Sequence, residues 1–137
     1  MQATHSIEIT KAAESNVSKL DFDNIPLGRT FTDHMFICLY EDGEWQTPKI
    51  QPLGMIPTHP AAMALHYGQA IFEGMKATVN EAGEPLLFRP EENAKRLNFS
   101  ARRLGMPEFP ETLFVEALKA LVDLDRNWIP PQQGSAL

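Results

Sequence analysis

The sequence of 137 residues contains one cysteine and no long apolar run. A single thiol, Cys38, forms no internal disulfide and no cysteine-built metal site, and in the apolar run of residues 35–40 we expect it to be a buried small hydrophobe. No stretch approaches the roughly 20 apolar residues that span a bilayer, and the first twenty residues lack the apolar centre of a secretory signal. We therefore expect a cytoplasmic protein without a membrane segment.

Clustered positive charge is also scarce. The net charge is -6, and the pair Arg102 and Arg103 is too short a cluster to bind phosphate backbones, which argues against a nucleic-acid partner. The motifs GxGxxG, GxxxxGK[ST], HExxH and GxSxG are missing, and the histidines at positions 5, 34, 59 and 66 lack the spacing of metal ligands. The hydrophobic share of 43% with 22% charged residues suits one globular domain. We predict no metal site.

The first half of the chain predicts hairpins after an irregular arm. Residues 1–30 lack periodicity and contain turn signals, so we expect an arm with at most a short strand. Residues 35–40 form a predicted strand, which turns at Asp42-Gly43 and returns over residues 45–50, where Pro48 requires an edge or irregular position. Pro60 can begin a helical turn over residues 61–64. A second hairpin is predicted from residues 71–79 and 85–88.

The second half predicts two helices. From Pro90, the residues Ala94, Leu97, Ala101 and Leu104 fall at helical spacing, and Gly105 and Pro107 stop the helix. Glu91 with Lys95 and Glu92 with Arg96 are predicted ion pairs on its surface. A second amphipathic helix begins near Pro110 and should end by Trp128. The fold class is therefore α+β, with an antiparallel sheet built from hairpins and two adjacent helices.

Residues 65–77, LHYGQAIFEGMKA, are the most unusual stretch. Tyr67 and Phe72 are large and rigid, while Gly68 and Gly74 remove side chains where the backbone turns or something approaches closely. This mixture suits a pocket wall, but composition alone favours aromatic residues that fill a core. His66 is either a proton carrier or, more in line with its setting, a residue that orders local backbone.

Arg96 has two readings as well. It lies beside the apolar stripe of its helix, so it is either a solvated residue paired with Glu92 or a group that reaches past the helix surface to a ligand.

Four segments carry a resemblance to a known family: LHYGQAIFEGMKA, FRPEENAKRL at 88–97, FTDHM at 31–35 and LDRNWIP at 124–130. Together they resemble the branched-chain amino-acid aminotransferases, pyridoxal-phosphate enzymes of fold type IV. The resemblance implies the small N-terminal domain of the D-amino-acid-aminotransferase-like fold at residues 31–137, preceded by an arm at 1–30. It also implies that the lysine-bearing domain lies beyond residue 137.

In such enzymes an amino group moves between leucine, isoleucine or valine and 2-oxoglutarate. The resemblance implies that Arg96 binds the phosphate of pyridoxal 5'-phosphate, and that Tyr67, Phe72 and Gly74 line the substrate site, with Tyr67 reaching the other subunit of a homodimer. The lysine that binds the cofactor is expected outside this chain, so the chain contains no catalytic residue and the fragment alone is predicted to be inactive. A D-amino-acid aminotransferase, an aminodeoxychorismate lyase, or a non-catalytic binding or oligomerisation domain are the alternatives.

Overall fold

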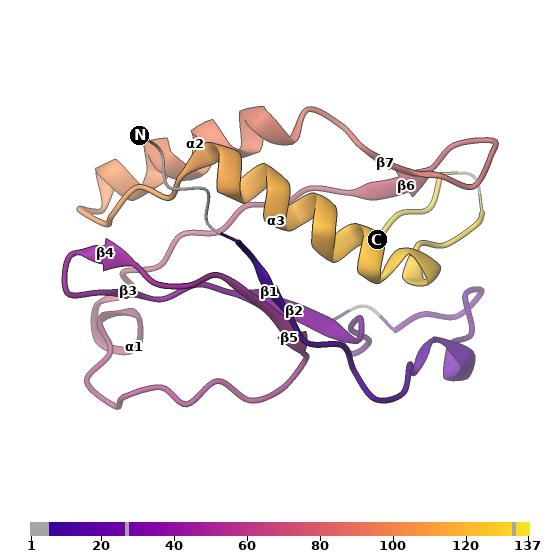
Figure 1. The fold of residues 1–137 in the computed structure, drawn as a ribbon, viewed down its shortest axis with the longest axis horizontal. Coiled ribbons are helices and arrows are strands. Elements are labelled where there is room, and N and C mark those ends of the chain that lie inside the picture. Colours follow the sequence, from indigo (N-terminus) through magenta and orange to yellow (C-terminus); the bar gives the residue numbers. More distant parts are fainter. Residues whose placement is uncertain (1–5, 27, 133) are drawn as a thin grey trace.

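The computed structural model describes residues 6–26, 28–132 and 134–137. Figure 1 shows strands β1, β2 and β5 in the middle of the molecule, with helices α2 (Pro90–Arg103) and α3 (Glu111–Leu124) together on one side. The other elements, in chain order, are β1 (Glu8–Ile9), η1 (Val17–Lys19), β2 (His34–Ile37), β3 (Tyr40–Glu41), β4 (Glu44–Trp45), β5 (Lys49–Pro52), α1 (Met63–Tyr67), β6 (Ala77–Val79), β7 (Pro85–Leu87) and η2 (Arg126–Trp128). The predicted α+β class is confirmed.

The first predicted hairpin is present with its predicted turn. Asp42 and Gly43 have φ angles of 53° and 86°, the left-handed conformations that Asp-Gly favours between β3 and β4. The two arms of the hairpin differ in length, because two residues separate β2 from β3 whereas three separate β4 from β5. Pro48 is one of these three residues, where the extra residue interrupts regular pairing. Pro48 is thus irregular, as predicted, but its side chain is buried beside the central strand β5 and not at an edge.

One pairing departs from the antiparallel prediction. The arm contributes β1, which runs parallel to β5 with Ile9 opposite Ile50, so the order in the three-stranded sheet is β1-β5-β2. The long stretch of chain between β1 and β5, which includes β2, permits this arrangement, since parallel neighbours need a long connection. Its consequence is that Ile50 lies in a strand with neighbours on both sides and is fully buried.

The second predicted hairpin is also present, as β6 and β7, with Ala77 opposite Leu87. Ala77 packs in a core cluster with Val122 of α3 and Ile129. On the other edge of β6, the N–H and the carbonyl of Ala77 bond the carbonyl and the N–H of Leu137 at 2.8 and 2.9 Å. The last residues therefore lie beside β6.

Both long helices are confirmed, and α2 ends where Gly105 and Pro107 predict. Its buried face is Ala94, Asn98 and Ala101, whereas Leu104, assigned to the stripe, is exposed. The buried polar residue Asn98 is satisfied because its amide donates to the carbonyl of Phe109 and its oxygen accepts from the N–H of Phe109, each at 2.8 Å. It thereby fixes the connection between α2 and α3.

The predicted ion pairs on α2 are wrong. Lys95 bonds Glu92 at 2.8 Å, one residue closer than the predicted partner Glu91, and Arg96 bonds Glu73, far away in the sequence. The helical turn expected over residues 61–64 is likewise displaced, because α1 begins at Met63 and continues to Tyr67. Sequence spacing therefore predicted the approximate positions of the helical turn and of the charged residues, but not the side chains that the charged residues bond.

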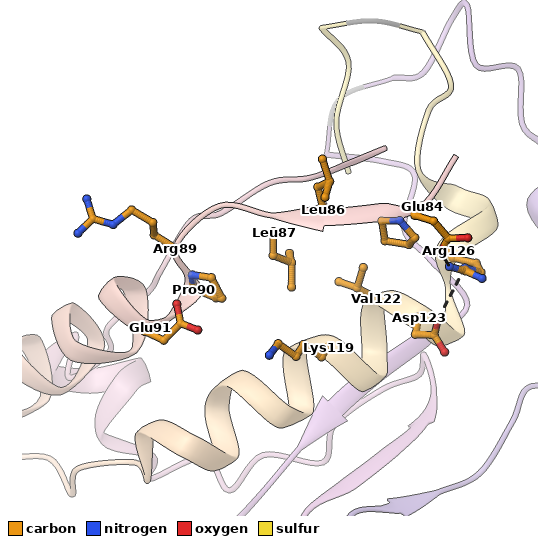
Figure 2. A pocket seen from close by; sticks show the side chains of 11 residues that line it. Glu84, Leu86, Leu87, Arg89, Pro90, Glu91, Lys119, Val122, Asp123 and Arg126 are labelled. Carbon is orange, nitrogen blue, oxygen red and sulfur yellow. Dashed lines mark hydrogen bonds and ion pairs between the residues drawn. The ribbon is translucent and has the colours of Figure 1, made fainter. Parts of the chain in front are cut away.

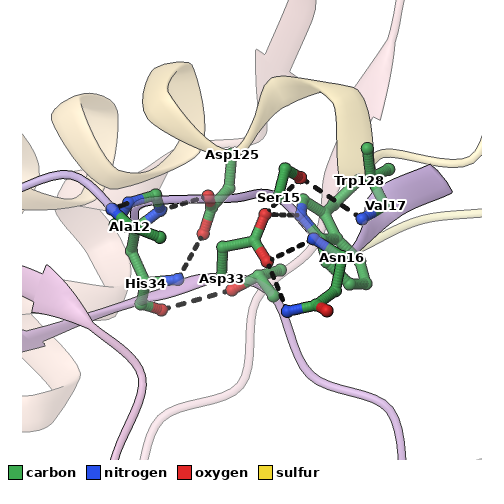
Figure 3. A network of polar contacts seen from close by, with 9 residues as sticks. Ala12, Ser15, Asn16, Val17, Asp33, His34, Asp125 and Trp128 are labelled. Atoms are coloured by element: carbon green, nitrogen blue, oxygen red, sulfur yellow. Dashed lines mark hydrogen bonds and ion pairs between the residues drawn. The ribbon is translucent and has the colours of Figure 1, made fainter. Parts of the chain in front are cut away.

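A buried polar network attaches the arm to the sheet and to the end of α3 (Figure 3). Asp33 accepts hydrogen bonds from the Ser15 hydroxyl, the Asn16 N–H and Trp128 Nε1 at 2.5, 2.9 and 2.8 Å. Burial by itself would raise the pKa of Asp33, but these hydrogen bonds together hold it below its ordinary value. Asp33 is therefore stabilised as a carboxylate by groups from the arm and from η2.

The next residue, His34, extends this network in the opposite direction. Its Nε2 accepts from the N–H of Ala12 at 2.8 Å, and Nδ1 lies 2.6 Å from Asp125 Oδ1. Because Nε2 acts as an acceptor, the ring proton is on Nδ1 and donates to Asp125. We call these two residues with their partners the arm network.

Candidate functional site

Residues 65–77 form a largely exposed segment, which we call the site segment. It begins in α1, which ends at Gly68 with φ of 61° and the Gly68 N–H bonded to the carbonyl of Met63. A left-handed residue at this position favours glycine. His66 Nε2 lies 2.7 Å from the carbonyl of Pro60, which is the backbone-ordering role expected from the sequence. The segment then runs without regular structure to β6.

The aromatic residues of the site segment do not fill the core. Tyr67 is 79% exposed and Phe72 is 90% exposed, and four apolar residues that precede them in the sequence are exposed as well: Met55, Ile56, Met63 and Leu65. The core reading favoured by composition alone is therefore wrong for these two aromatic side chains. Exposed apolar groups gathered in one part of a chain are typical of a surface that binds a ligand or another polypeptide.

Glu73 fastens the site segment to α2. Its two carboxylate oxygens accept from Nε and Nη2 of Arg96 at 2.8 and 2.7 Å, a bidentate pair. Asn93, one turn earlier on α2, donates to Glu73 Oε2 at 2.9 Å and to the carbonyl of Gly74 at 3.2 Å. Gln69 adds a further anchor by donating to the carbonyl of Leu104 at 2.9 Å.

The electrostatics of this anchor are asymmetric. The Glu73 side chain is 6% exposed, whereas the Arg96 side chain is 64% exposed. The hydrogen bonds from Arg96 lower the pKa of Glu73, and they outweigh the opposite effect of burial with help from Asn93. Glu73 is thus an inner carboxylate, and Arg96 presents the rest of its guanidinium outward.

The structure brings three of the four predicted site residues to one place. Phe72 and Gly74 flank Glu73 in sequence, and Glu73 binds Arg96, so these residues meet at the N-terminal half of α2. A Cβ atom added to Gly74 would have no atom within 4 Å among the described residues, so the packing described here does not require glycine there. Tyr67 is elsewhere, in α1, which lies well apart from α2 in Figure 1.

One pocket lies away from these residues. It has a volume of about 600 Å³ between β7 and α3, where Leu87 and Val122 point toward each other (Figure 2). Arg126, one of the charged side chains that line it, is bonded to Glu84 at 2.6 Å and lies 3.6 Å from Asp123. We assign no ligand to this pocket.

A more apolar pocket of about 400 Å³ adjoins the site segment. Ile71 lines it together with Phe36, Leu97 and Phe109, and so does Cys38, whose Sγ donates to the carbonyl of Gln46. Burial raises the pKa of the Cys38 thiol, so this group is a protonated, largely apolar neighbour. Cys38 is half-buried and not fully buried as expected.

The described residues contain neither a metal site nor a membrane-spanning helix. No group of three histidine, cysteine, aspartate or glutamate side chains there could hold a metal ion. Within the same residues, no helix has the length and apolar character needed to cross a membrane.

Sequence reasoning missed Glu73 and Asn93. Glu73 precedes Arg96 by 23 residues, and no helical or strand periodicity relates such positions. The available signals were an acidic residue between aromatic Phe72 and Gly74, and an asparagine one helical turn before an arginine. Neither identifies its partner without the fold.

Comparison with known proteins defines the class of this α+β chain. No family model matches it. Branched-chain-amino-acid transaminase 1 of Bacillus subtilis is 44% identical over 120 residues, which cover 87% of this chain and 34% of the relative. Branched-chain-amino-acid aminotransferase 2 of the same organism is 44% identical over 135 residues, 98% of this chain and 36% of the relative. The chain is thus a homologue of amino-acid transaminases.

The relatives also agree on a particular kind of transaminase. The branched-chain-amino-acid aminotransferase of Mycolicibacterium smegmatis is 42% identical over 134 residues, 93% of this chain and 36% of the relative. The chain is homologous to the branched-chain-amino-acid aminotransferases, which confirms the resemblance found in its motifs. It spans about a third of the length of the curated relatives that it matches.

Proposed function

We propose that this chain is the small N-terminal domain of a branched-chain aminotransferase that moves the amino group between leucine, isoleucine or valine and 2-oxoglutarate. The observation that carries the proposal is the 44% identity to a branched-chain-amino-acid aminotransferase over 98% of this chain, which includes the site segment and α2. The exposed aromatic residues and the outward guanidinium of Arg96 support the proposal, because they offer an apolar surface and a charged donor to a ligand.

The cofactor in this proposal is pyridoxal 5'-phosphate, and the donor chemistry at Arg96 fits its phosphate. The guanidinium is planar, permanently charged and largely exposed, and Nη1 has no hydrogen-bond partner among the described residues. Arg96 would hold the phosphate by charge-assisted hydrogen bonds. When bound, the cofactor supplies the electron sink for the reaction, and this chain contributes binding and orientation.

Phe72, Gly74 and Tyr67 would contact the aliphatic side chain of the substrate. A branched aliphatic group is recognised by a dry, shaped surface, which aromatic rings provide and which Gly74 leaves open. Because α1, which carries Tyr67, lies apart from α2, which carries Arg96, in Figure 1, we propose that Tyr67 contributes to the second site of a cytoplasmic homodimer. Sedimentation of the complete enzyme should show dimers, and a monomer that retains full activity would contradict this part of the proposal.

The isolated chain should have no aminotransferase activity. A lysine that reacts with the cofactor needs a neutral amine, which usually requires burial or a nearby positive charge. All six lysines of the chain are exposed, and the bond from Lys95 to Glu92 raises the pKa of Lys95. Borohydride reduction of the chain mixed with pyridoxal phosphate should label no single lysine stoichiometrically, and a stoichiometric label with leucine-dependent glutamate formation would overturn this expectation.

The experiment that tests the proposal is Arg96→Ala in the complete enzyme. Loss of one charge-assisted contact of about 1.5 to 3 kcal/mol should weaken pyridoxal-phosphate binding roughly ten- to over a hundredfold. Arg103→Ala is the matched control, because Arg103 is exposed on the same helix. Equal cofactor affinity in the two variants, or a wild-type enzyme without leucine-dependent glutamate formation, would reject the proposal.

A further inference from the structure

The pairing of Glu73 with Arg96 uses one edge of the guanidinium and leaves the other. A guanidinium carries five N–H groups, which can form two bidentate edges in one plane. Glu73 takes the edge made by Nε and Nη2, with distances of 2.8 and 2.7 Å. The edge made by Nη1 and the second N–H of Nη2 has no partner among the described residues and belongs to a side chain that is 64% exposed.

Glu73 is itself held firmly, which a simple surface ion pair is not. Its side chain is 6% exposed, and Asn93 donates to its Oε2 from the same helix that carries Arg96. Asn93 also donates to the carbonyl of Gly74, so both the side chain and the adjoining backbone are tied to α2. A fixed carboxylate restricts the rotation of a long, flexible arginine side chain, which lowers the entropy lost when the arginine binds an anion.

We infer that Glu73 is a positioning residue that aims the free edge of Arg96 at the cofactor phosphate, and this inference rests on the proposed function. Glu73 does not touch the phosphate in this arrangement. It acts on the guanidinium from the inner side, while the phosphate binds from the outer side. The same residue places Phe72 and Gly74, its sequence neighbours, beside that anion, so one carboxylate sets the distance between the phosphate end and the aliphatic end of the site.

The competing arrangement makes the opposite prediction. Glu73 neutralises part of the charge of Arg96, so a carboxylate that merely occupies the arginine would weaken phosphate binding. Its removal would then tighten binding. A purely structural carboxylate would change the stability of the domain and the affinity of every ligand by the same factor. These three roles of Glu73 predict different changes in the contribution that the phosphate group makes to the affinity for the cofactor.

The test is the ratio of the affinities for pyridoxal 5'-phosphate and pyridoxal in the complete enzyme, measured by fluorescence titration. Glu73→Gln keeps the size of the side chain but places an amide N–H₂ against the donors of Arg96, and it should lower this ratio about tenfold, because each 1.4 kcal/mol of lost interaction is tenfold. Glu92→Gln, an acidic residue on α2 that bonds Lys95, should leave the ratio unchanged. In an Arg96→Ala background, Glu73→Gln should have no further effect on the ratio.

The possible outcomes separate the inference from the proposed function. If Arg96→Ala lowers the ratio and Glu73→Gln leaves it unchanged or raises it, Arg96 binds phosphate and the positioning role of Glu73 is overturned. If neither variant changes the ratio, the phosphate assignment of Arg96 fails, and the inference fails with it. If Glu73→Gln prevents folding, Asn93→Ala, which frees Glu73 on one side only, should lower the ratio severalfold, and an unchanged ratio there would overturn the inference.

Discussion

The arm network and the site segment show two different ways in which an irregular stretch of chain is held against the rest of the molecule. The arm network is polar and its centre is buried, and Asp33 and His34 use their side chains to bond groups in the arm, just after α3 and in η2. The site segment is apolar and exposed, with Tyr67 and Phe72 turned outward and its side-chain anchoring through Gln69 and Glu73. The polar groups of the first stretch are hydrogen-bonded within the chain, whereas the second leaves its largest side chains exposed.

This difference indicates where stability and where function reside. Buried polar groups must be paired because an unpaired one costs free energy, so the arm network contributes to folding. Exposed aromatic side chains contribute little to folding, and they are available for contact with a ligand or another polypeptide. Substitutions in the two regions should therefore separate into losses of stability and losses of activity.

The largest effect is expected from Asp33→Ala. The substitution removes the common acceptor of Ser15, Asn16 and Trp128 and leaves the buried Trp128 Nε1 unpaired, so the free energy of unfolding should fall by about 3 kcal/mol. Urea denaturation of the chain measures this loss. Glu14→Ala, at an exposed position of the arm, should change stability by less than about 0.5 kcal/mol. Equal effects would show that the network does not hold the arm.

The next effect concerns activity. In the complete enzyme, Phe72→Ala should lower kcat/KM for leucine by roughly tenfold more than for alanine, since only the larger substrate uses the lost apolar surface, worth about 1 to 3 kcal/mol. Steady-state kinetics with both substrates measures the ratio. Phe88→Ala, an exposed phenylalanine outside the site segment, is the control. Parallel losses on leucine and alanine would indicate structural damage instead.

Acid should reveal a smaller difference between the two regions. The pKa values of Asp33 and Glu73 both lie below their ordinary values of 3.8 and 4.5, so the unfolded chain binds more protons and stability falls as the pH decreases through that range. The Asp33 contribution should resist salt because Asp33 and its partner Trp128 are buried and no cation bonds Asp33 among the described residues, whereas that of Glu73 should weaken in salt because Arg96 is exposed. Urea titrations of Asp33→Asn and Glu73→Gln between pH 5 and 3, at low and high salt, test this, and identical salt responses would contradict it.

The smallest effect is expected when the same aromatic residue is changed in the chain alone. Phe72→Ala should change the free energy of unfolding by less than about 0.5 kcal/mol, because its ring has few contacts to lose. Tyr67→Ala should behave alike. A loss of 2 kcal/mol or more, on the order expected for a buried aromatic residue, would mean that these rings pack against the chain in solution.

The features that the sequence predicted correctly depend on neighbouring residues. The Asp42-Gly43 turn follows from the conformations these two residues favour, and the ends of α2 follow from Pro90 and Gly105. The bond between Glu73 and Arg96, the parallel strand β1 and the burial of Asn98 could not be predicted, because each depends on a contact that only the folded chain creates. For the site, resemblance selected Arg96 and Phe72, but no pattern indicated the carboxylate between them.

The pairing of Leu137 with Ala77 has a consequence for hydrogen exchange. The main-chain N–H and carbonyl of Ala77 both bond Leu137, although Ala77 belongs to a strand whose other edge is occupied by β7. The amide hydrogen of Ala77 is therefore shielded from solvent by the last residue of the chain and not by its own hairpin. The hydrogen-exchange rate of this amide therefore reports how often the bond between Ala77 and Leu137 opens, and NMR can measure it without any mutation.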